Sequence, residues 1–227
     1  VDDIVYLTPK IRLFFQFLVG ILTWFYGLRI GSVDISFLGP SFNYINLPII
    51  LNLFFTVVFI VGAINAINWI DGLDGLASGH IFISSIGICL IFLSVNSSIS
   101  NFLMPLCLAG SSLGFLILNF YPAKIYMGDG GSNFLGFMIA TTTILTTNSN
   151  NENTSLLTLL FLNFLPIFNM VVVVFERIYN GLSPFLPDQR HIHYKLIKSG
   201  LSHKKSVLLL YFLTAISILI AVIFQNK

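Results

Sequence analysis

Charged residues and cysteines are scarce in this chain of 227 residues. Only 9% of its residues are charged, whereas about a quarter are charged in an average soluble domain, and its mean hydropathy is +0.91. This composition excludes an ordinary soluble domain, and a net charge of only +2 argues against a nucleic-acid partner. The two cysteines, Cys89 and Cys107, lie in apolar runs without metal-ligand spacing, so we expect two buried small hydrophobes rather than a disulfide.

A signal peptide, an initiator methionine and low-complexity linkers are also missing from the sequence. The chain starts Val1-Asp2-Asp3, and from this start we expect that further residues precede it. No second domain or internal repeat is visible. We therefore predict one integral-membrane domain over residues 1–227.

Long apolar runs are abundant. Roughly 20 apolar residues cross the hydrocarbon layer as a helix, and seven runs approach or exceed this length, although the fifth is short and rich in threonine. They predict an all-α, polytopic membrane protein with about seven transmembrane helices, over residues 11–30, 47–67, 76–95, 102–120, 133–147, 155–175 and 207–224.

The basic residues divide unequally if the seven spans alternate across the membrane. Nine of the eleven Lys and Arg fall on the side of the N-terminal segment, and two, Arg29 and Lys227, fall on the other. Because basic residues accumulate on the cytoplasmic side, the N-terminal segment and the polar loop at 177–206 are predicted to face the cytoplasm. Most of the acids lie on the same side, and since acids contribute little to orientation, they point to chemistry at this face.

The interiors of the predicted spans contain no Lys, Arg, Asp or Glu. A transporter usually keeps ionisable groups near the bilayer midplane, whereas the charged groups here gather at one interface. This arrangement suits a protein that meets a water-soluble molecule and a lipid headgroup at the same depth.

Two adjacent carboxylates, Asp2 and Asp3, form the first of four polar motifs on that face, with Leu-Thr-Pro-Lys-Ile-Arg following at residues 7–12. Adjacent carboxylates repel one another unless a cation or a proton relieves the repulsion, which suits a site for a metal ion and a phosphate. A solvated helix end is the simpler interpretation of an isolated pair of this kind.

The second motif, residues 65–79, reads NAINWIDGLDGLASG. On a helix Asp71 and Asp74 would share a face, with Asn68 one turn earlier, and the glycine after each Asp allows a tight turn. Oxygen donors without cysteine favour Mg²⁺ or Mn²⁺ over Zn²⁺. A capped turn between two spans is the alternative, since Asp is common in turns and caps.

Glycines surround Asp129 in the third motif, residues 119–136, which reads NFYPAKIYMGDGGSNFLG. We expect Ser132 to cap the fifth span, whose N-terminus would offer backbone N–H groups to a phosphate. Neither the Walker nor the Rossmann spacing is present, so binding of a nucleotide through those motifs is unsupported. Close helix packing would also explain the glycines, but it leaves Asp129 without a role.

The fourth motif, residues 177–205, is basic and contains two histidines that line up as His-Ile-His. Pro187 and Asp188 predict the start of a short amphipathic helix at the interface, on which His191 and His193 would diverge. A polybasic loop that attracts anionic lipid is the alternative, and the same charges would also attract a diphosphate.

Together the four motifs resemble those of the polyprenyl-phosphate N-acetylhexosamine-1-phosphate transferases, a group within glycosyltransferase family 4. The last motif is similar to the branch that adds GlcNAc-type sugars, and less similar to the phospho-MurNAc-pentapeptide branch, which tends to carry three histidines. Two departures are Tyr194, where the family often has a further His, and the family's helices before the acidic pair, which this chain lacks. The matching patterns are DD with LTPKxRL, NxxNxxDGLDGLAxG, NxxPAKxxMGDxGSxFLG and RIxxGxSPFxPDxxHIH.

The resemblance implies transfer of a sugar 1-phosphate from a UDP-N-acetylhexosamine to undecaprenyl phosphate, with release of UMP and with Mg²⁺ or Mn²⁺ as cofactor. It places the active site at the cytoplasmic face of the inner (plasma) membrane, in cell-wall or lipopolysaccharide biosynthesis, and makes 177–206 a catalytic loop. It implies metal ligation by Asn68 and Asp129. It also implies catalytic roles for Asp2, Asp3, Asp129, His191 and His193, and substrate contacts by Asp71, Asp74, Asn119, Lys124 and Arg190.

Other functions compatible with the sequence belong to different classes. One alternative is the phospho-MurNAc-pentapeptide transferase of peptidoglycan synthesis, and another is a transporter or flippase that uses the basic face as a headgroup receptor. A third is an inactive scaffold without the upstream helices. The sequence leaves open which sugar is transferred and whether the protein forms a homodimer.

Overall fold

The computed structural model describes residues 8–34, 44–94, 98–148, 156–184 and 188–225. Most of these residues are helical. Between the first two helices in the sequence, two short strands form an antiparallel ribbon in which Val33 pairs with Ile45. The elements are α1 (Pro9–Phe25), β1 (Ser32–Asp34), β2 (Tyr44–Asn46), α2 (Ile49–Ile70), α3 (Leu76–Ser94), α4 (Ile99–Asn119), α5 (Gly128–Asn148), α6 (Leu156–Leu162), α7 (Phe164–Tyr179), α8 (Ile192–Lys198) and α9 (His203–Gln225).

Four of the helices in the described residues are long and apolar enough to cross a membrane, namely α2, α3, α4 and α9. The structure is therefore that of a membrane protein of the all-α class, as predicted, but seven spans are not supported. The reasons differ among the remaining helices. Helix α1 has 17 residues, α5 is rich in glycine and threonine, and the predicted span over residues 155–175 is divided in two.

The division between α6 and α7 falls at Asn163, a buried residue with non-helical φ and ψ of −119° and 22°. The Asn163 amide donates a hydrogen bond of 3.1 Å to the Thr143 hydroxyl on α5. Pro166 follows in the first turn of α7, where its missing N–H costs nothing. The helix is therefore interrupted at Asn163, whose side chain bonds to another helix, and α7 begins after it with a proline in its first turn.

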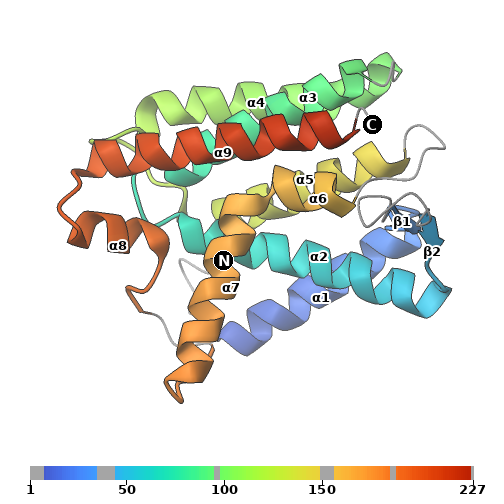
Figure 1. Ribbon diagram of the computed structural model, residues 1–227, viewed down its shortest axis with the longest axis horizontal. Helices are drawn as coiled ribbons and strands as arrows, with labels where there is room; N and C mark the ends of the chain where they lie inside the picture. The colour runs from blue at the N-terminus through green and yellow to red at the C-terminus, as the bar shows by residue number, and fades with distance from the viewer. Residues whose placement is uncertain (1–7, 35–43, 95–97, 149–155, 185–187, 226–227) are drawn as a thin grey trace.

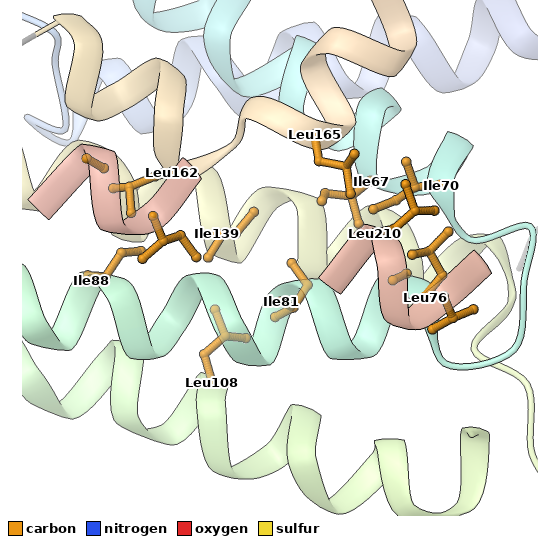
Figure 2. Close-up of a cluster of buried hydrophobic side chains, with 14 of the residues drawn as sticks. Ile67, Ile70, Leu76, Ile81, Ile88, Leu108, Ile139, Leu162, Leu165 and Leu210 are labelled. Carbon is orange, nitrogen blue, oxygen red and sulfur yellow. The ribbon is translucent and has the colours of Figure 1, made fainter. Parts of the chain in front are cut away.

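Helix α3 is the most buried of the four apolar helices. About two thirds (67%) of its apolar stretch is buried, against 22% for α4. Figure 1 shows α3 beside α4 and α9 on one side of the molecule, α1 and α2 on the other, and α5 and α6 between them. Figure 2 shows Ile81 and Ile88 of α3 facing Ile139 of α5, with Leu108 of α4 on the other side of α3. The bundle therefore has its core around α3 and α5.

Glycines allow the closest helix contacts. A Cβ at Gly136 of α5 would lie 2.7 Å from the Ile64 Cα of α2, so the two backbones meet directly. Gly79 of α3 lies under the ring of Tyr211 from α9, whose hydroxyl donates a 2.5 Å hydrogen bond to the Gly75 carbonyl. These contacts fix α5 and α9 against the two helices that flank the second motif.

Both cysteines are free, Cys89 half-buried and Cys107 exposed on α4. The prediction of two buried cysteines is therefore wrong for Cys107. The same helix exposes Leu103, Leu106 and Leu113, as expected of a surface that faces lipid. A small apolar thiol is tolerated on such a surface.

Candidate functional site

A polar cavity of about 380 Å³ lies where α1 and α5 begin and where α2 and α7 end. In Figure 1 this end of the bundle, near α8, is the one opposite the β1–β2 ribbon. Segments that are far apart in the sequence each contribute side chains to its wall. Among them are Arg12, Asn68, Asp71, Asp129, Arg177, Asp188, His191 and His193.

Helix α5 begins at Gly128, earlier than the predicted start at residue 133, and this places Asp129 in its first turn. Ser132 is therefore inside the helix, where its hydroxyl donates to the Gly128 carbonyl at 3.1 Å. The prediction that Ser132 caps the helix is wrong. Gly128 has a φ of +66°, a left-handed conformation that favours glycine and lets the helix start at this point.

Asn68 lies against Asp129. The sequence predicts such proximity, because two residues that bind one ion must lie close together. The Asn68 amide nitrogen is 3.0 Å from Asp129 Oδ1 and 2.9 Å from Ser132 Oγ. The residues are 61 positions apart and come from the last turn of α2 and the first turn of α5. The Asn68 amide thus donates to the carboxylate and to the hydroxyl, and the two side chains share one corner of the cavity.

Arg12 provides the positive charge at this corner. Its guanidinium Nη1 lies 2.5 Å from Asp129 Oδ2, and the Asp129 side chain is 47% exposed toward the cavity. Behind this pair three amide side chains from three helices meet. The shortest of their contacts is the 2.7 Å hydrogen bond from Asn65 to Gln16, and Asn133 lies 3.5 Å from Gln16.

Asp71 and Asp74 do not share a face, contrary to the prediction from their spacing. Helix α2 ends at Ile70, so both residues lie in the turn before α3 and point to different surroundings. Asp71 lines the cavity, whereas Asp74 Oδ2 accepts a 3.0 Å hydrogen bond from the Ala123 backbone. The turn thus supplies one acid to the cavity and uses the other to hold a neighbouring loop.

The environment of Asp71 disfavours its charge. Burial is the main cause, and the nearby carboxylates of Asp129 and Asp74 add to it, so that the pKa of Asp71 rises to about 7. A cation bound among these acids would relieve the repulsion.

Three other predicted substrate contacts are not among the residues that line the cavity. Asn119 is buried, and its side chain accepts from the Gly75 backbone and the Ser78 hydroxyl and donates to the Ile125 carbonyl. The side chain of Lys124 is exposed near this loop. Arg190 contacts the Glu176 carbonyl at 3.3 Å and Asp188 at 3.4 Å. The described contacts give Asn119 a role in holding the turn at Gly75.

The two histidines are parallel rather than divergent, which corrects the prediction. Helix α8 begins at Ile192, and His191 is its N-cap residue, so only His193 lies in the helix. The rings are 5.5 Å apart with an interplanar angle of 3°. Both line the cavity. The predicted helix start is also wrong for Asp188, which lies before α8, and Pro187 lies outside the described residues.

His193 is fully buried, and among the residues that the structure describes neither of its ring nitrogens has a hydrogen-bond partner. Its ring packs against Gly72, where a Cβ would come within 2.4 Å of His193 Nε2. Burial, with the charges of His191 and His203, lowers the pKa of His193 to about 3. A buried imidazole without partners at a cavity wall is a plain candidate to bind a ligand.

Arg177 organises the wall beside the histidines, a role that the sequence did not reveal. It is buried and binds Asp188 through Nε at 3.0 Å and Nη2 at 3.1 Å, and it also donates to the Pro184 carbonyl. This pairing is the main reason why the pKa of Asp188 is lowered. The guanidinium lies 4.8 Å from the ring centre of Trp69, another cavity residue without an assigned role.

The predicted catalytic acids Asp2 and Asp3 lie outside the described residues. Among the residues described, no cluster of three or more His, Cys, Asp or Glu side chains has the geometry of a metal site. The donor set that the structure does bring together is the pair Asn68 and Asp129, with Asp71 near them.

Comparison with known proteins identifies the family. Residues 1–147 match the family model described as glycosyl transferase family 4. This match covers more than half of the chain and includes three of the four motifs, so the chain belongs to glycosyl transferase family 4.

Several curated relatives are similar over most of this chain. One from Bacillus subtilis, named probable undecaprenyl-phosphate N-acetylglucosaminyl 1-phosphate transferase, is 36% identical over 99% of the chain. A Yersinia pestis undecaprenyl-phosphate alpha-N-acetylglucosaminyl 1-phosphate transferase is 30% identical over 98% of it. A decaprenyl-phosphate N-acetylglucosaminephosphotransferase from Mycolicibacterium smegmatis is 29% identical over 84%. The chain spans 62%, 61% and 54% of the length of these relatives, respectively.

Proposed function

We propose that this protein transfers N-acetylhexosamine 1-phosphate from a UDP-sugar to undecaprenyl phosphate and releases UMP. The observation that carries the proposal is the single cavity to which the second, third and fourth motifs each bring polar side chains. Family membership and the names of the relatives support the same reaction. GlcNAc is the sugar that those names favour.

The chemistry of this reaction explains why the cavity is lined by hydrogen-bond donors and positively charged side chains. An oxygen of the lipid phosphate attacks the phosphorus that carries the sugar, and the bond from that phosphorus to the oxygen of UMP breaks. Several phosphate charges meet, so the site must neutralise charge and align the reactants. Arg12 and Arg177 provide fixed positive charge, and the histidines provide N–H donors. A phosphate monoester has a second pKa of about 6, so a general base is needed less than neutralisation of charge.

Mg²⁺ or Mn²⁺ is part of the proposal, with Asn68 and Asp129 as its protein ligands. The Asp129 carboxylate fits the cation, because Mg²⁺ commonly binds one or two protein carboxylates and completes its coordination with substrate phosphates and water. Asn68 would bind through its amide oxygen, so its side chain would have to turn, since its nitrogen faces Asp129 in this structure. When bound, the ion would neutralise charge on the departing UMP. The assignment of Asp71 to the nucleotide-sugar pocket belongs to the same proposal, because this acid also lines the cavity.

The proposed location is the plasma membrane, with the cavity at its cytoplasmic face. The basic residues near the cavity, including Arg12, Arg177 and Lys195, support this orientation under the positive-inside rule. We further propose that α1, α5 and the α6–α7 pair lie in the bilayer beside the four apolar helices. The lipid phosphate would then reach the cavity from the membrane and the UDP-sugar from the cytoplasm.

The test is a transfer assay with the intact protein in membranes that contain undecaprenyl phosphate and Mg²⁺. Radiolabelled UDP-N-acetylhexosamines are supplied one at a time, and labelled lipid and UMP are expected in equal amounts. Asp129→Asn should lower the rate by more than about 100-fold, the upper end of the cost of losing a mere outer-shell partner of a metal. Lipid that crosses the membrane without UMP formation would instead support the transporter alternative.

The matched control is Glu176→Gln. Glu176 pairs with Lys195 at the end of α7 and does not line the cavity, so its loss should leave the transfer rate nearly unchanged. Equal rates for the Asp129 variant and the Glu176 variant would contradict the proposal. For the acidic pair, Asp2→Asn or Asp3→Asn is expected to reduce turnover while partly preserving substrate binding.

A further inference from the structure

Asn169 is a buried amide on α7 that the sequence analysis did not single out. Its side chain is 1% exposed and lies within a helix whose neighbouring side chains are mostly apolar. It contacts the histidine segment of the fourth motif at two atoms. The Asn169 Oδ1 atom accepts a 2.9 Å hydrogen bond from the Ile192 backbone N–H, and Nδ2 lies 3.2 Å from His191 Nδ1.

The first contact fixes the orientation of the Asn169 amide. A backbone N–H can only donate, so the atom that faces Ile192 must be the carbonyl oxygen of the side chain. The NH₂ group therefore faces His191. Because an amide NH₂ can only donate, His191 Nδ1 must accept, which requires a lone pair on that nitrogen.

We infer that Asn169 is a positioning residue that holds His191 as the neutral tautomer with its proton on Nε2. The inference rests on the proposed function in one respect, since it gives His191 the task of donating Nε2–H to a phosphate of the substrate. His191 does not serve as a general base, because the lone pair of its unprotonated Nδ1 already accepts a hydrogen bond from Asn169. A proton on Nδ1 would face the N–H of the amide.

The surroundings of His191 hold its ring in the same place. Trp69 meets it edge to face, with ring centres 5.6 Å apart, and His193 lies parallel to it on another side. The charged groups that act on it are Arg177 on α7, Asp188 in the preceding segment and Lys195 on α8. Burial and Arg177 lower the pKa of His191 more than Asp188 raises it, which agrees with a neutral ring.

The direct test is the tautomer of His191 in the ligand-free protein. Intact protein labelled with ¹⁵N-histidine in lipid nanodiscs would be examined by NMR at pH 7.5, and the His191 signals would be assigned by comparison with His191→Gln. We expect an unprotonated Nδ1 and a protonated Nε2. A proton on Nδ1, or a doubly protonated ring, would overturn the inference without the need for any variant of Asn169.

Asn169→Asp should reverse the arrangement. A carboxylate accepts from both the Ile192 N–H and an Nδ1–H, so the proton of His191 is expected to move to Nδ1. Its pKa should rise by about 1 to 3 units, the usual effect of an adjacent opposite charge. The pH profile of the transfer reaction should then gain a step at this new pKa. An unchanged tautomer in a folded Asn169→Asp variant would contradict the inference.

Asn163→Asp is the matched control for the introduced charge. Asn163 is equally buried and lies at the start of the same helix, but within the described part of the chain its amide nitrogen binds Thr143 and its oxygen has no hydrogen-bond partner. The His191 signals should not change in this variant. Because the spectra are recorded without substrate, they test the tautomer separately. Failure to form labelled lipid would count against the proposed function, and the wrong tautomer would count against this inference.

Discussion

Arg12 and Asp129, 117 positions apart, form a 2.5 Å ion pair between the first turns of α1 and α5. Arg12 is thus already paired with the carboxylate that is proposed to bind a divalent cation. Asn68 contacts the other oxygen of the same carboxylate. A cation that binds Asp129 must therefore compete with Arg12, and an arginine displaced from Asp129 would be close to the phosphates of a substrate.

Arg12→Gln is expected to strengthen the binding of a divalent cation to the ligand-free protein while it weakens the transfer reaction. Loss of a partly exposed ion pair is worth up to about 1 kcal/mol, so the affinity for Mn²⁺ should rise roughly 2- to 5-fold. Electron paramagnetic resonance of free Mn²⁺ gives this affinity directly. Arg29→Gln is the control, since Arg29 stacks on Trp24 far from the cavity. Unchanged or weaker Mn²⁺ binding in the Arg12 variant would argue against competition.

Asp71→Asn is expected to stabilise the ligand-free protein at pH 8. The pKa of Asp71 is raised from 3.8 to about 7 in the fold, so between these values the folded protein holds a proton that the unfolded chain releases. The stabilisation is present below pH 3.8 and is lost as the pH rises through about 7. Removing the charge should gain roughly 2–4 kcal/mol at pH 8. Thermal unfolding of both proteins with a chelator present, at pH 8 and pH 4, tests this. A Tm of the Asp71→Asn variant below that of the unchanged protein at pH 8 would contradict it.

His193 should make the stability of the fold depend on pH in the opposite direction. Its pKa is lowered from 6.5 to about 3, so in this window the unfolded chain binds a proton that the folded protein does not. The full stability is present above pH 6.5, and about 3 kcal/mol is lost when the pH falls to 4. His193→Asn, which does not titrate, should lose less stability over the same range. Parallel Tm curves for the two proteins would refute the effect.

Gly136→Ala should separate α2 from α5 and thereby disturb the contact between Asn68 and Asp129. The added Cβ would lie 2.7 Å from the Ile64 Cα, and backbone cannot move aside as a side chain can. Overpacking of this kind costs about 1–3 kcal/mol, so both the Tm and the transfer rate should fall. The control is Gly114→Ala on α4, where a Cβ would meet nothing within 4 Å. Equal Tm values for the two variants would rule out the proposed close contact.

The positions of the apolar helices could be predicted from the sequence. The predicted spans 47–67 and 76–95 nearly coincide with α2 and α3, because a long apolar run has few alternatives to a buried helix. The break at Asn163 was not predicted, because one polar residue hardly changes the mean hydropathy of a long apolar run. An amide inside an apolar run is a signal that could have revealed both Asn163 and Asn169.

The structure places Asn68 beside Asp129, whereas the metal ligation that the resemblance implies for this pair stays a prediction. The roles of Asp71 and Asp74 could not be separated by spacing, because a tight turn and a helix place residues three apart in different directions. Contacts such as Arg177 with Trp69, or Gly136 with Ile64, depend on which faces of nearly uniform apolar helices meet. Apolar side chains on every face carry no information about that choice.

Helix α7 holds the histidine segment at two points. Arg177 binds Asp188 ahead of the histidines, and Asn169, about two turns earlier on the same helix, binds His191 and the backbone of Ile192. The histidines are therefore located by side chains of α7 rather than by the length of the chain that leads to them. Since α7 starts at the break at Asn163, a change in the tilt of α7 about this point would move Asn169 and Arg177 together and would shift His191 relative to Asp129.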